Sequence, residues 1–200
     1  MKEQDPFIKE IEDYAVEHYV PIMDRRAIDV LLGLLRIQKP GRILEVGSAI
    51  GYSAIRMATT LPNATILTIE RDTERYMKAI EFIERSGFTE RIRIIEADAL
   101  ELETDEIVNE SFDALFIDAA KGQYKRFFEK YAPALTAGGV IYCDNMFMHG
   151  MVLREDVDVP KRNRTMIRKL KEFTQWAMSH PDYEAVLLPF GDGILIATKK

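Results

Sequence analysis

The stretch "RILEVGSAIGYSAIRMA", residues 42–58, predicts a strand–loop–helix unit, because a buried strand, a glycine loop and a helix follow one another directly. Gly47 and Gly51 give a G-x-x-x-G spacing, which lets the chain turn tightly and a ligand approach the backbone. This spacing is neither the G-x-G-x-x-G of dinucleotide folds nor a P-loop. Glu45 beside the loop disfavours a pyrophosphate and favours a cation. The loop therefore predicts a nucleoside ligand without phosphates.

Outward from this loop, strands and helices alternate along the chain. Short β-branched apolar runs predict five buried strands, and two more strands flank "GD" near the C-terminus. The five strands are 42–46, 65–70, 92–97, 113–118 and 139–144; helices are expected at about 5–19, 24–36, 52–60, 73–86, 122–132 and 161–179, and 103–110 is not assigned. We predict an α/β, Rossmann-like fold with a doubly wound, mostly parallel seven-stranded sheet and a C-terminal antiparallel hairpin.

Length and composition predict one domain over residues 1–200, with N-terminal helices at 1–38 and a core at 41–200. Hydrophobic residues make up 47% and charged residues 30%, and no apolar run is long enough to span a membrane. The charged N-terminus lacks a signal-peptide core, and one cysteine, Cys143, excludes an internal disulfide. These features predict a cytoplasmic protein with no membrane partner.

Acidic residues stand where consecutive predicted strands end, and ligands of such sheets bind at that edge. Glu70 ends the second strand about twenty residues after the glycine loop, which suits hydrogen bonds to both ribose hydroxyls. Asp98 follows the third strand and suits an adenine amino group, with the Ala99 N–H facing the ring. Any one acid alone is explained as a solvated loop residue. Together they predict S-adenosylmethionine, which has adenine, ribose and a sulfonium cation but no phosphate.

A second polar set follows the next two strands. Asp118 ends the fourth strand within "LFIDAAKGQY", residues 115–124, and Asp144 and Asn145 end the fifth. Because side chains alternate along a strand, Asp144 and Asn145 share one site only where the strand breaks into a loop. Two carboxylates and an amide oxygen suit Mg²⁺. Lys121 lies one turn beyond Asp118, as a base for an acceptor hydroxyl or as half of a surface ion pair.

The motifs "EVGSAIGYSAIRMA", "IDAAK" and "YCDN" together resemble the cation-dependent class I O-methyltransferases of the catechol and caffeoyl-CoA type, from about residue 14 onward. The resemblance implies that Asp118, Asp144 and Asn145 are the metal ligands. It also implies that Lys121 is the general base and that Asp118 contacts the cofactor.

The same resemblance places two further cofactor contacts. Met23 and Asp24 lie where the family's N-terminal segment closes over the cofactor, and Ser53 should bond the methionine carboxylate at a helix N-terminus. A homodimer is common in the family and agrees with an amphipathic N-terminal helix.

Within that family the chain is similar to the bacterial branch that methylates 5-hydroxyuridine at the tRNA wobble position. We therefore predict a Mg²⁺-dependent enzyme that makes 5-methoxyuridine in tRNA. The alternative acceptor is a small catechol-like or phenolic compound, since both acceptors offer two vicinal oxygens. An NAD-dependent oxidoreductase and a noncatalytic nucleoside-binding module are rivals that the missing G-x-G-x-x-G and the intact Lys121 disfavour.

Charge gives opposing indications about the acceptor. The formal net charge of -6 favours a small molecule. The segment "PKRNRTMIRKLK", residues 160–171, instead carries six cations between Lys161 and Lys171 with no acid among them, which suits tRNA phosphates. The same segment is also explained as the solvated face of one helix.

Overall fold

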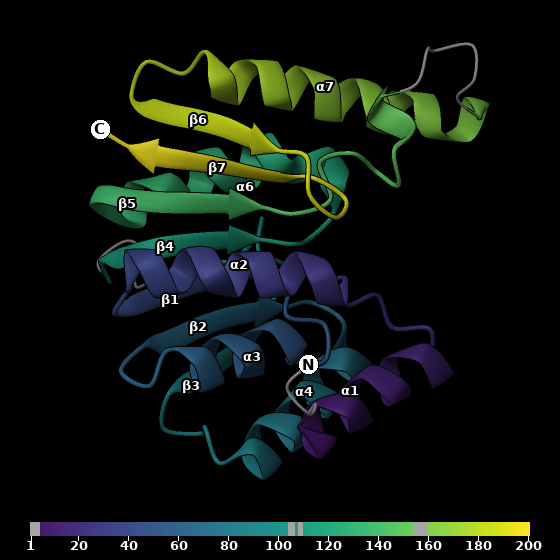
Figure 1. Ribbon diagram of the computed structural model, residues 1–200, viewed down its shortest axis with the longest axis vertical. Coiled ribbons are helices and arrows are strands. Elements are labelled where there is room, and N and C mark those ends of the chain that lie inside the picture. The colour runs from purple at the N-terminus through teal and green to yellow at the C-terminus, as the bar shows by residue number, and fades with distance from the viewer. Residues whose placement is uncertain (1–4, 104–106, 108–109, 154–159) are drawn as a thin grey trace. The chain divides into compact units, whose positions relative to one another are not determined.

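A computed structural model describes residues 5–103, 107, 110–153 and 160–200, and Figure 1 shows its ribbon. Seven strands and the helices between them form the Rossmann-like mixed sheet that the sequence predicts. Two compact units, residues 1–102 and 103–200, make up the chain. The expectation of one domain over 1–200 stays a prediction. Among the described residues, no helix combines the length and apolar character needed to cross a membrane.

The first unit carries three parallel strands in the order β3-β2-β1, so the carboxyl ends of these strands meet at one edge. Its elements are α1 (Pro6–Glu17), α2 (Arg25–Gln38), β1 (Arg42–Val46), α3 (Tyr52–Thr60), β2 (Thr65–Glu70), α4 (Thr73–Ser86) and β3 (Ile92–Glu96). Glu45 of β1 pairs in register with Thr68 of β2. This register brings the glycine loop after β1 beside the end of β2.

Aspartates begin three of these helices, which explains where the helices start. Asp5, Asp24 and Asp72 each accept a hydrogen bond from a backbone N–H in the first turn of the helix that follows. At the other end, α4 stops at Gly87, whose φ of +74° is a left-handed conformation that glycine adopts freely. These local signals fix the connections that lead into β1 and β3.

The second unit carries four strands in the order β4-β5-β7-β6. Its elements are β4 (Phe112–Ile117), the 3-10 helix η1 (Lys121–Gln123), α6 (Tyr124–Tyr131), η2 (Ala132–Ala134), β5 (Leu135–Cys143), η3 (Met151–Leu153), η5 (Lys161–Asn163), α7 (Arg164–Met178), β6 (Tyr183–Leu188) and β7 (Ile194–Lys199). β4 and β5 are parallel, whereas β7 is antiparallel to both β5 and β6. The predicted C-terminal antiparallel hairpin is therefore confirmed, with β7 between β5 and β6.

Strand β5 begins at Leu135, four residues before the predicted start at 139. Leu135 pairs with Phe112, and the register of β4 and β5 then shifts between Phe112 and Ala114. This early part of the strand contains two glycines, and Gly138 has a φ of +73°. It therefore lacks the alternating apolar residues from which a strand is predicted. Most of the unassigned segment 103–110 lies outside the described residues.

Candidate active site

The glycine loop after β1 is fastened to the end of β2. The backbone N–H groups of Gly47 and Ser48 donate to the Ile69 carbonyl at 3.0 and 3.2 Å. Gly47 has a φ of +100°, which a side chain would strain. The predicted tight turn is therefore present, and its backbone is fixed by β2.

Glu70 is the acid that holds this loop. One carboxylate oxygen accepts from the Ala49 N–H at 2.7 Å, and the other accepts from the N–H groups of Arg71 and Asp72 at 2.9 Å each. A carboxylate offers about four acceptor positions, so about one remains for another donor. Glu70 is thus a structural anchor of the loop, a role that the sequence analysis did not predict, and its contact with the ribose stays a prediction.

Glu45 is fully buried beneath the loop, and its carboxylate accepts hydrogen bonds from the hydroxyls of Ser53 and Thr68. Burial raises the pKa of Glu45 to about 7, against the two hydrogen bonds that lower it, and the charge of Glu70 raises it further. A nearby cation would favour the charged carboxylate, as the predicted sulfonium ligand requires. The Ser53 hydroxyl faces Glu45, so its bond to a methionine carboxylate stays a prediction.

Ser48 is a loop residue that the sequence did not single out. Its side chain is 2% exposed, and its hydroxyl oxygen has no hydrogen-bond partner within the described part of the chain. A buried hydroxyl without a partner is costly unless a ligand bonds it. This hydroxyl and the buried Glu45 carboxylate are polar groups of the loop that the expected S-adenosylmethionine, with its hydrogen-bonding groups and its positive charge, would suit.

The residues after β3 form a short turn. One oxygen of Asp98 accepts from the Leu100 N–H at 2.8 Å, and the other lies 3.6 Å from the Arg71 guanidinium. Ala99 is buried, with 7% of its surface exposed. The turn holds Asp98 just beyond the strand end, where the sequence predicts an adenine contact.

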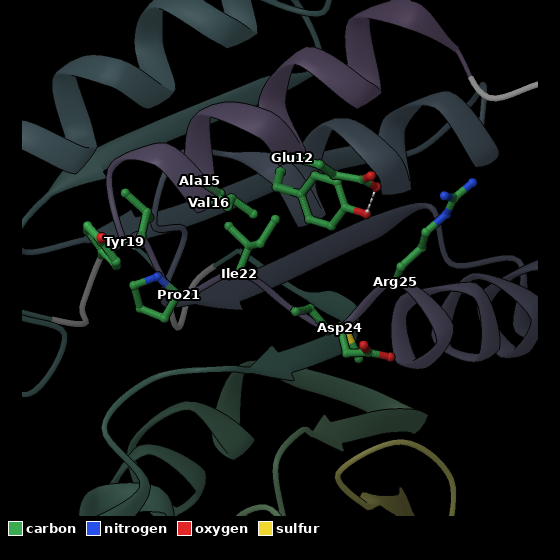
Figure 2. Close-up of a pocket in the computed structure, with 11 residues that line it drawn as sticks. Glu12, Ala15, Val16, Tyr19, Pro21, Ile22, Asp24 and Arg25 are labelled. Carbon is green, nitrogen blue, oxygen red and sulfur yellow. Dashed lines mark hydrogen bonds between the residues drawn. The ribbon is translucent and has the colours of Figure 1, made fainter.

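Met23 and Asp24 lie on the connection between α1 and α2. Met23 is 3% exposed, and Asp24 begins α2 by accepting from the N–H groups of Arg26 and Ala27. A hollow of about 530 Å³ lies at this connection, and the hydroxyl of Tyr52 on its wall donates to Glu12 at 2.7 Å. Figure 2 shows Glu12, Pro21 and Asp24 around this hollow. The predicted cofactor-closing segment therefore borders a real hollow in the first unit.

In the second unit, the predicted metal ligands follow the ends of β4 and β5. Asp144 and Asn145 lie directly beyond Cys143, the last residue of β5, and Asn145 has a left-handed φ of +61° that asparagine tolerates well. The Asp144 backbone is fixed on both sides, since its N–H donates to the Ile117 carbonyl and its carbonyl accepts from the Tyr124 hydroxyl. Strand β5 thus ends at Cys143, and Asp144 and Asn145 lie in the loop that follows, as the sequence predicts.

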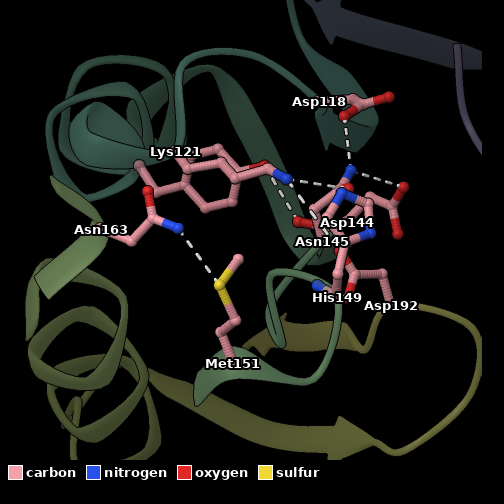
Figure 3. Close-up of polar contacts among 9 residues, drawn as sticks. Asp118, Lys121, Asp144, Asn145, His149, Met151, Asn163 and Asp192 are labelled. Carbon is pink, nitrogen blue, oxygen red and sulfur yellow. Dashed lines mark hydrogen bonds and ion pairs between the residues drawn. The ribbon is translucent and has the colours of Figure 1, made fainter. Parts of the chain in front are cut away.

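Asn145 joins the predicted ligands and the predicted base into one cluster (Figure 3). Its amide nitrogen donates to Asp118 at 3.0 Å and to Asp144 at 2.9 Å, and its amide oxygen accepts from Lys121 Nζ at 3.1 Å. The electropositive end of the amide therefore lies between two carboxylates. Rotating this amide by half a turn would give three oxygens facing one point, the ligand set expected for Mg²⁺.

Electrostatics favour a cation at this cluster. Burial raises the pKa of Asp144 to about 7, and the charges of Asp118 and Asp192 act in the same direction. One oxygen of Asp144 is buried without a hydrogen-bond partner among the described residues. The described chain has no group of three His, Cys, Asp or Glu side chains arranged for a metal, so the set relies on two carboxylates and an amide. Hard oxygen donors with excess negative charge fit a divalent cation.

Asp192 is the member of the cluster that sequence reasoning missed. It lies in the turn between β6 and β7, with one carboxylate oxygen 4.0 Å from Lys121 Nζ and 3.8 Å from His149 Nδ1. The only signal in the sequence was an Asp-Gly pair in a tight turn, which predicts a turn and no site. His149 is 80% exposed in its side chain, whereas Met146 and Phe147 are buried.

Comparison with known proteins gives one consistent family. The family model described as O-methyltransferase matches residues 1–200. Caffeoyl-CoA O-methyltransferase 1 of Zea mays is 30% identical over 206 residues, which cover 96% of this chain and 78% of that protein.

Solved structures agree with this match. A Staphylococcus aureus protein provisionally named caffeoyl-CoA O-methyltransferase is 34% identical, with a TM-score of 0.91 over 98% of this chain and 94% of that one. A Bacillus cereus O-methyltransferase in complex with S-adenosylhomocysteine is 26% identical, with a TM-score of 0.86 over 100% of this chain and 93% of that one. The chain therefore belongs to the O-methyltransferase family of the caffeoyl-CoA type and is an S-adenosylmethionine-dependent O-methyltransferase.

Proposed function

We propose that the enzyme is Mg²⁺-dependent and methylates the 5-hydroxyl of 5-hydroxyuridine at the tRNA wobble position, giving 5-methoxyuridine. The observation that carries the metal dependence is that Asn145 lies within hydrogen-bond distance of Asp118, of Asp144 and of Lys121. A bound divalent cation would acidify the acceptor hydroxyl and fix its orientation through two vicinal oxygens.

The chain's own residues supply the remaining chemistry. Asp118, Asp144 and Asn145 would hold the cation once the Asn145 amide is rotated, and Lys121 Nζ, which then leaves the Asn145 oxygen, would take the proton of the acceptor hydroxyl. The acceptor oxygen would then bond the methyl carbon as the carbon–sulfur bond of S-adenosylmethionine breaks, with S-adenosylhomocysteine as the other product. Positioning the reactants at contact distance should supply much of the rate.

The basic stretch, residues 160–171, supports tRNA as the acceptor. Its exposed cations are Lys161, Arg162, Arg164, Arg168 and Lys169, whereas Lys171 is half-buried. The apolar face of α7 is turned inward, with Ile167 and Leu170 buried, so the cations face outward.

Two contacts link this basic stretch to segments that follow the predicted metal ligands and the predicted base. Asn163 of η5 donates to the Met151 sulfur of η3 at 3.2 Å, as Figure 3 shows. A methyl group added to Gly122 would lie 3.4 Å from the Met166 sulfur and 3.6 Å from Lys169 Cδ, so α7 packs on the residue next to Lys121. Phosphates bound along η5 and α7 could therefore position one base at the cluster.

A small phenolic acceptor is the second candidate. It is favoured by the names of relatives such as the Zea mays caffeoyl-CoA enzyme. Mass spectrometry of wobble uridines in tRNA from cells that lack this protein tests the choice directly. Loss of 5-methoxyuridine supports the tRNA acceptor, and an unchanged level removes it.

A triple variant tests the basic stretch itself. Arg162→Gln, Arg164→Gln and Arg168→Gln together should lower the salt slope of tRNA binding by about three units, about one for each lost cation. Methylation of a small catechol should stay unchanged, because the cluster is untouched. The matched control replaces three exposed cations elsewhere, Arg26, Arg36 and Lys200, with glutamine and should retain tRNA methylation. Equal loss on tRNA and catechol would contradict RNA docking.

A further inference from the structure

The turn between β6 and β7 grips the loop that follows the predicted metal ligands. The Met146 N–H donates to the Gly193 carbonyl at 3.0 Å, and the Phe147 N–H donates to the Asp192 carbonyl at 2.7 Å. Gly193 has a φ of +84°, and a Cβ there would lie 2.8 Å from the Phe147 ring. The turn therefore binds the loop through two backbone hydrogen bonds and a close packing contact that requires glycine at position 193.

The Asp192 side chain divides two contacts between its oxygens. Oδ1 accepts from the backbone N–H of His149, which fixes the far end of the loop. Oδ2 lies 4.0 Å from Lys121 Nζ and 3.8 Å from Nδ1 of the exposed His149 ring, and it is buried without a hydrogen-bond partner in the described residues. One carboxylate thus faces the loop with one oxygen and the predicted base with the other.

We propose that Asp192 is a positioning residue for methyl transfer, which orients Lys121 through its charge and holds loop 146–149 through its other oxygen. This inference rests on the proposed role of Lys121 as the base. A lysine amine on a flexible four-carbon chain needs fixed partners to keep one orientation. Asn145 Oδ1 lies 3.1 Å from Lys121 Nζ, but this contact is lost when the amide rotates to bind the cation. The Asp192 carboxylate, on the turn between β6 and β7, is the partner that remains.

Two substitutions separate the two contacts. Asp192→Asn keeps the shape and an acceptor oxygen for the His149 N–H but removes the charge that faces Lys121. Asp192→Ala removes both contacts. The matched control is Asp182→Asn, which removes an exposed carboxylate next to the opposite end of the same hairpin.

The assay uses tRNA that carries 5-hydroxyuridine as the acceptor, with saturating S-adenosylmethionine and Mg²⁺. Asp192→Asn should lower kcat by about 10- to 100-fold, which is the effect of misplacing a reacting group. Its acceptor KM, its Kd for S-adenosylhomocysteine and its Tm should stay unchanged. Hydrogen exchange should find the His149 amide protected in Asp192→Asn and exposed in Asp192→Ala. Asp182→Asn should behave as wild type in every measurement.

A wild-type kcat for Asp192→Asn would overturn the proposal. A loss of kcat that arises only because the variant is partly unfolded at the assay temperature, as a lower Tm would show, would overturn it as well. Lys121→Ala separates this failure from failure of the proposed function. If Lys121→Ala keeps its kcat, Lys121 is not the base and both assignments fall. If Lys121→Ala is inactive while Asp192→Asn is normal, only the role of Asp192 falls.

Discussion

Carboxylates stand at strand ends in both units, but their surroundings differ. In the first unit, Glu70 accepts three backbone N–H groups, and Glu45 accepts two hydroxyls. In the second unit, Asp144 and Asp192 each have a buried oxygen without a hydrogen-bond partner in the described chain. Backbone N–H groups satisfy Glu70 and side-chain hydroxyls satisfy Glu45, whereas the carboxylates of the second unit are only partly satisfied.

This difference indicates what each region needs. Backbone N–H groups stabilise an ionised carboxylate without any ligand, so the glycine loop is built by the fold itself. In the second unit, the like charges of Asp118 and Asp192 disfavour the ionised form of Asp144, and the Asn145 amide and the Lys121 amine offset this only in part. Such a cluster gains most from additional positive charge, which agrees with the proposed divalent cation.

Breaking the cluster should have the largest effect. EDTA should abolish methyl transfer and Mg²⁺ should restore it. Asp144→Ala should lower kcat by about 10³-fold, because losing metal assistance costs several kcal/mol of transition-state stabilisation. S-adenosylhomocysteine binding, measured by calorimetry, should persist.

Asp113→Asn, which changes an acid at the opposite end of β4, serves as the control and should keep full activity. Direct Mn²⁺ binding should also be lost in Asp144→Ala and kept in Asp113→Asn. Full activity in excess chelator would refute the metal site.

The strand ends were predictable because they depend on local pattern. β4 and β5 end at Ile117 and Cys143, one residue before the predicted limits, so Asp118 and Asp144 lie at the strand ends, as their position in the sequence predicts. The start of β5 was missed because its exposed residues around Gly138 lack apolar alternation. A regular pattern therefore gave one end of the strand and not the other.

The missed site features depend on tertiary contacts. Asp192 meets Lys121 from 71 positions away in the sequence, and only the pairing of β7 with β5 brings its turn to the cluster. The anchoring role of Glu70 and the buried Ser48 hydroxyl depend in the same way on how the loop after β1 meets the end of β2. In these cases the residue type indicates a polar or charged role, but it does not indicate which residues the side chain contacts.

Glu45 offers a pH test of the first unit. Its pKa is raised from 4.5 to about 7 on folding, so its favourable contribution is complete below pH 4.5 and is lost as the pH rises through about 7. Glu45→Gln cannot ionise and should escape this loss. It should match wild type near pH 4.5 and exceed wild type at pH 8 by up to about 3 kcal/mol in free energy of unfolding.

Urea unfolding of the ligand-free protein at several pH values measures this difference. Thr68→Val is a second useful variant, since it removes one hydroxyl donor from the Glu45 carboxylate. It should lower the free energy of unfolding further at pH values where Glu45 is ionised. A pH-independent difference between Glu45→Gln and wild type would show that Glu45 is not perturbed by burial.

Glu70 should give the smallest effect and the sharpest reading of the loop. Glu70→Ala leaves three backbone N–H groups without their acceptor and should weaken S-adenosylhomocysteine binding by roughly 1–3 kcal/mol. Glu70→Gln can keep one carbonyl oxygen for Arg71 and Asp72 but then turns an amide donor toward the Ala49 N–H. It therefore tests the single bond that ties the glycine loop to β2.

The ribose contact separates from this anchoring by a double-mutant cycle with the 2′-deoxy analogue of S-adenosylhomocysteine. If Glu70 bonds the ribose, the analogue should lose affinity against wild type and lose little more against Glu70→Ala. If Glu70 only anchors the loop, the two losses should add. Additive losses would remove Glu70 from the ligand contacts but leave its role in anchoring the glycine loop. The carboxylate of Glu70 would then serve the fold alone, whereas the carboxylates of the Asp144 cluster would serve the reaction.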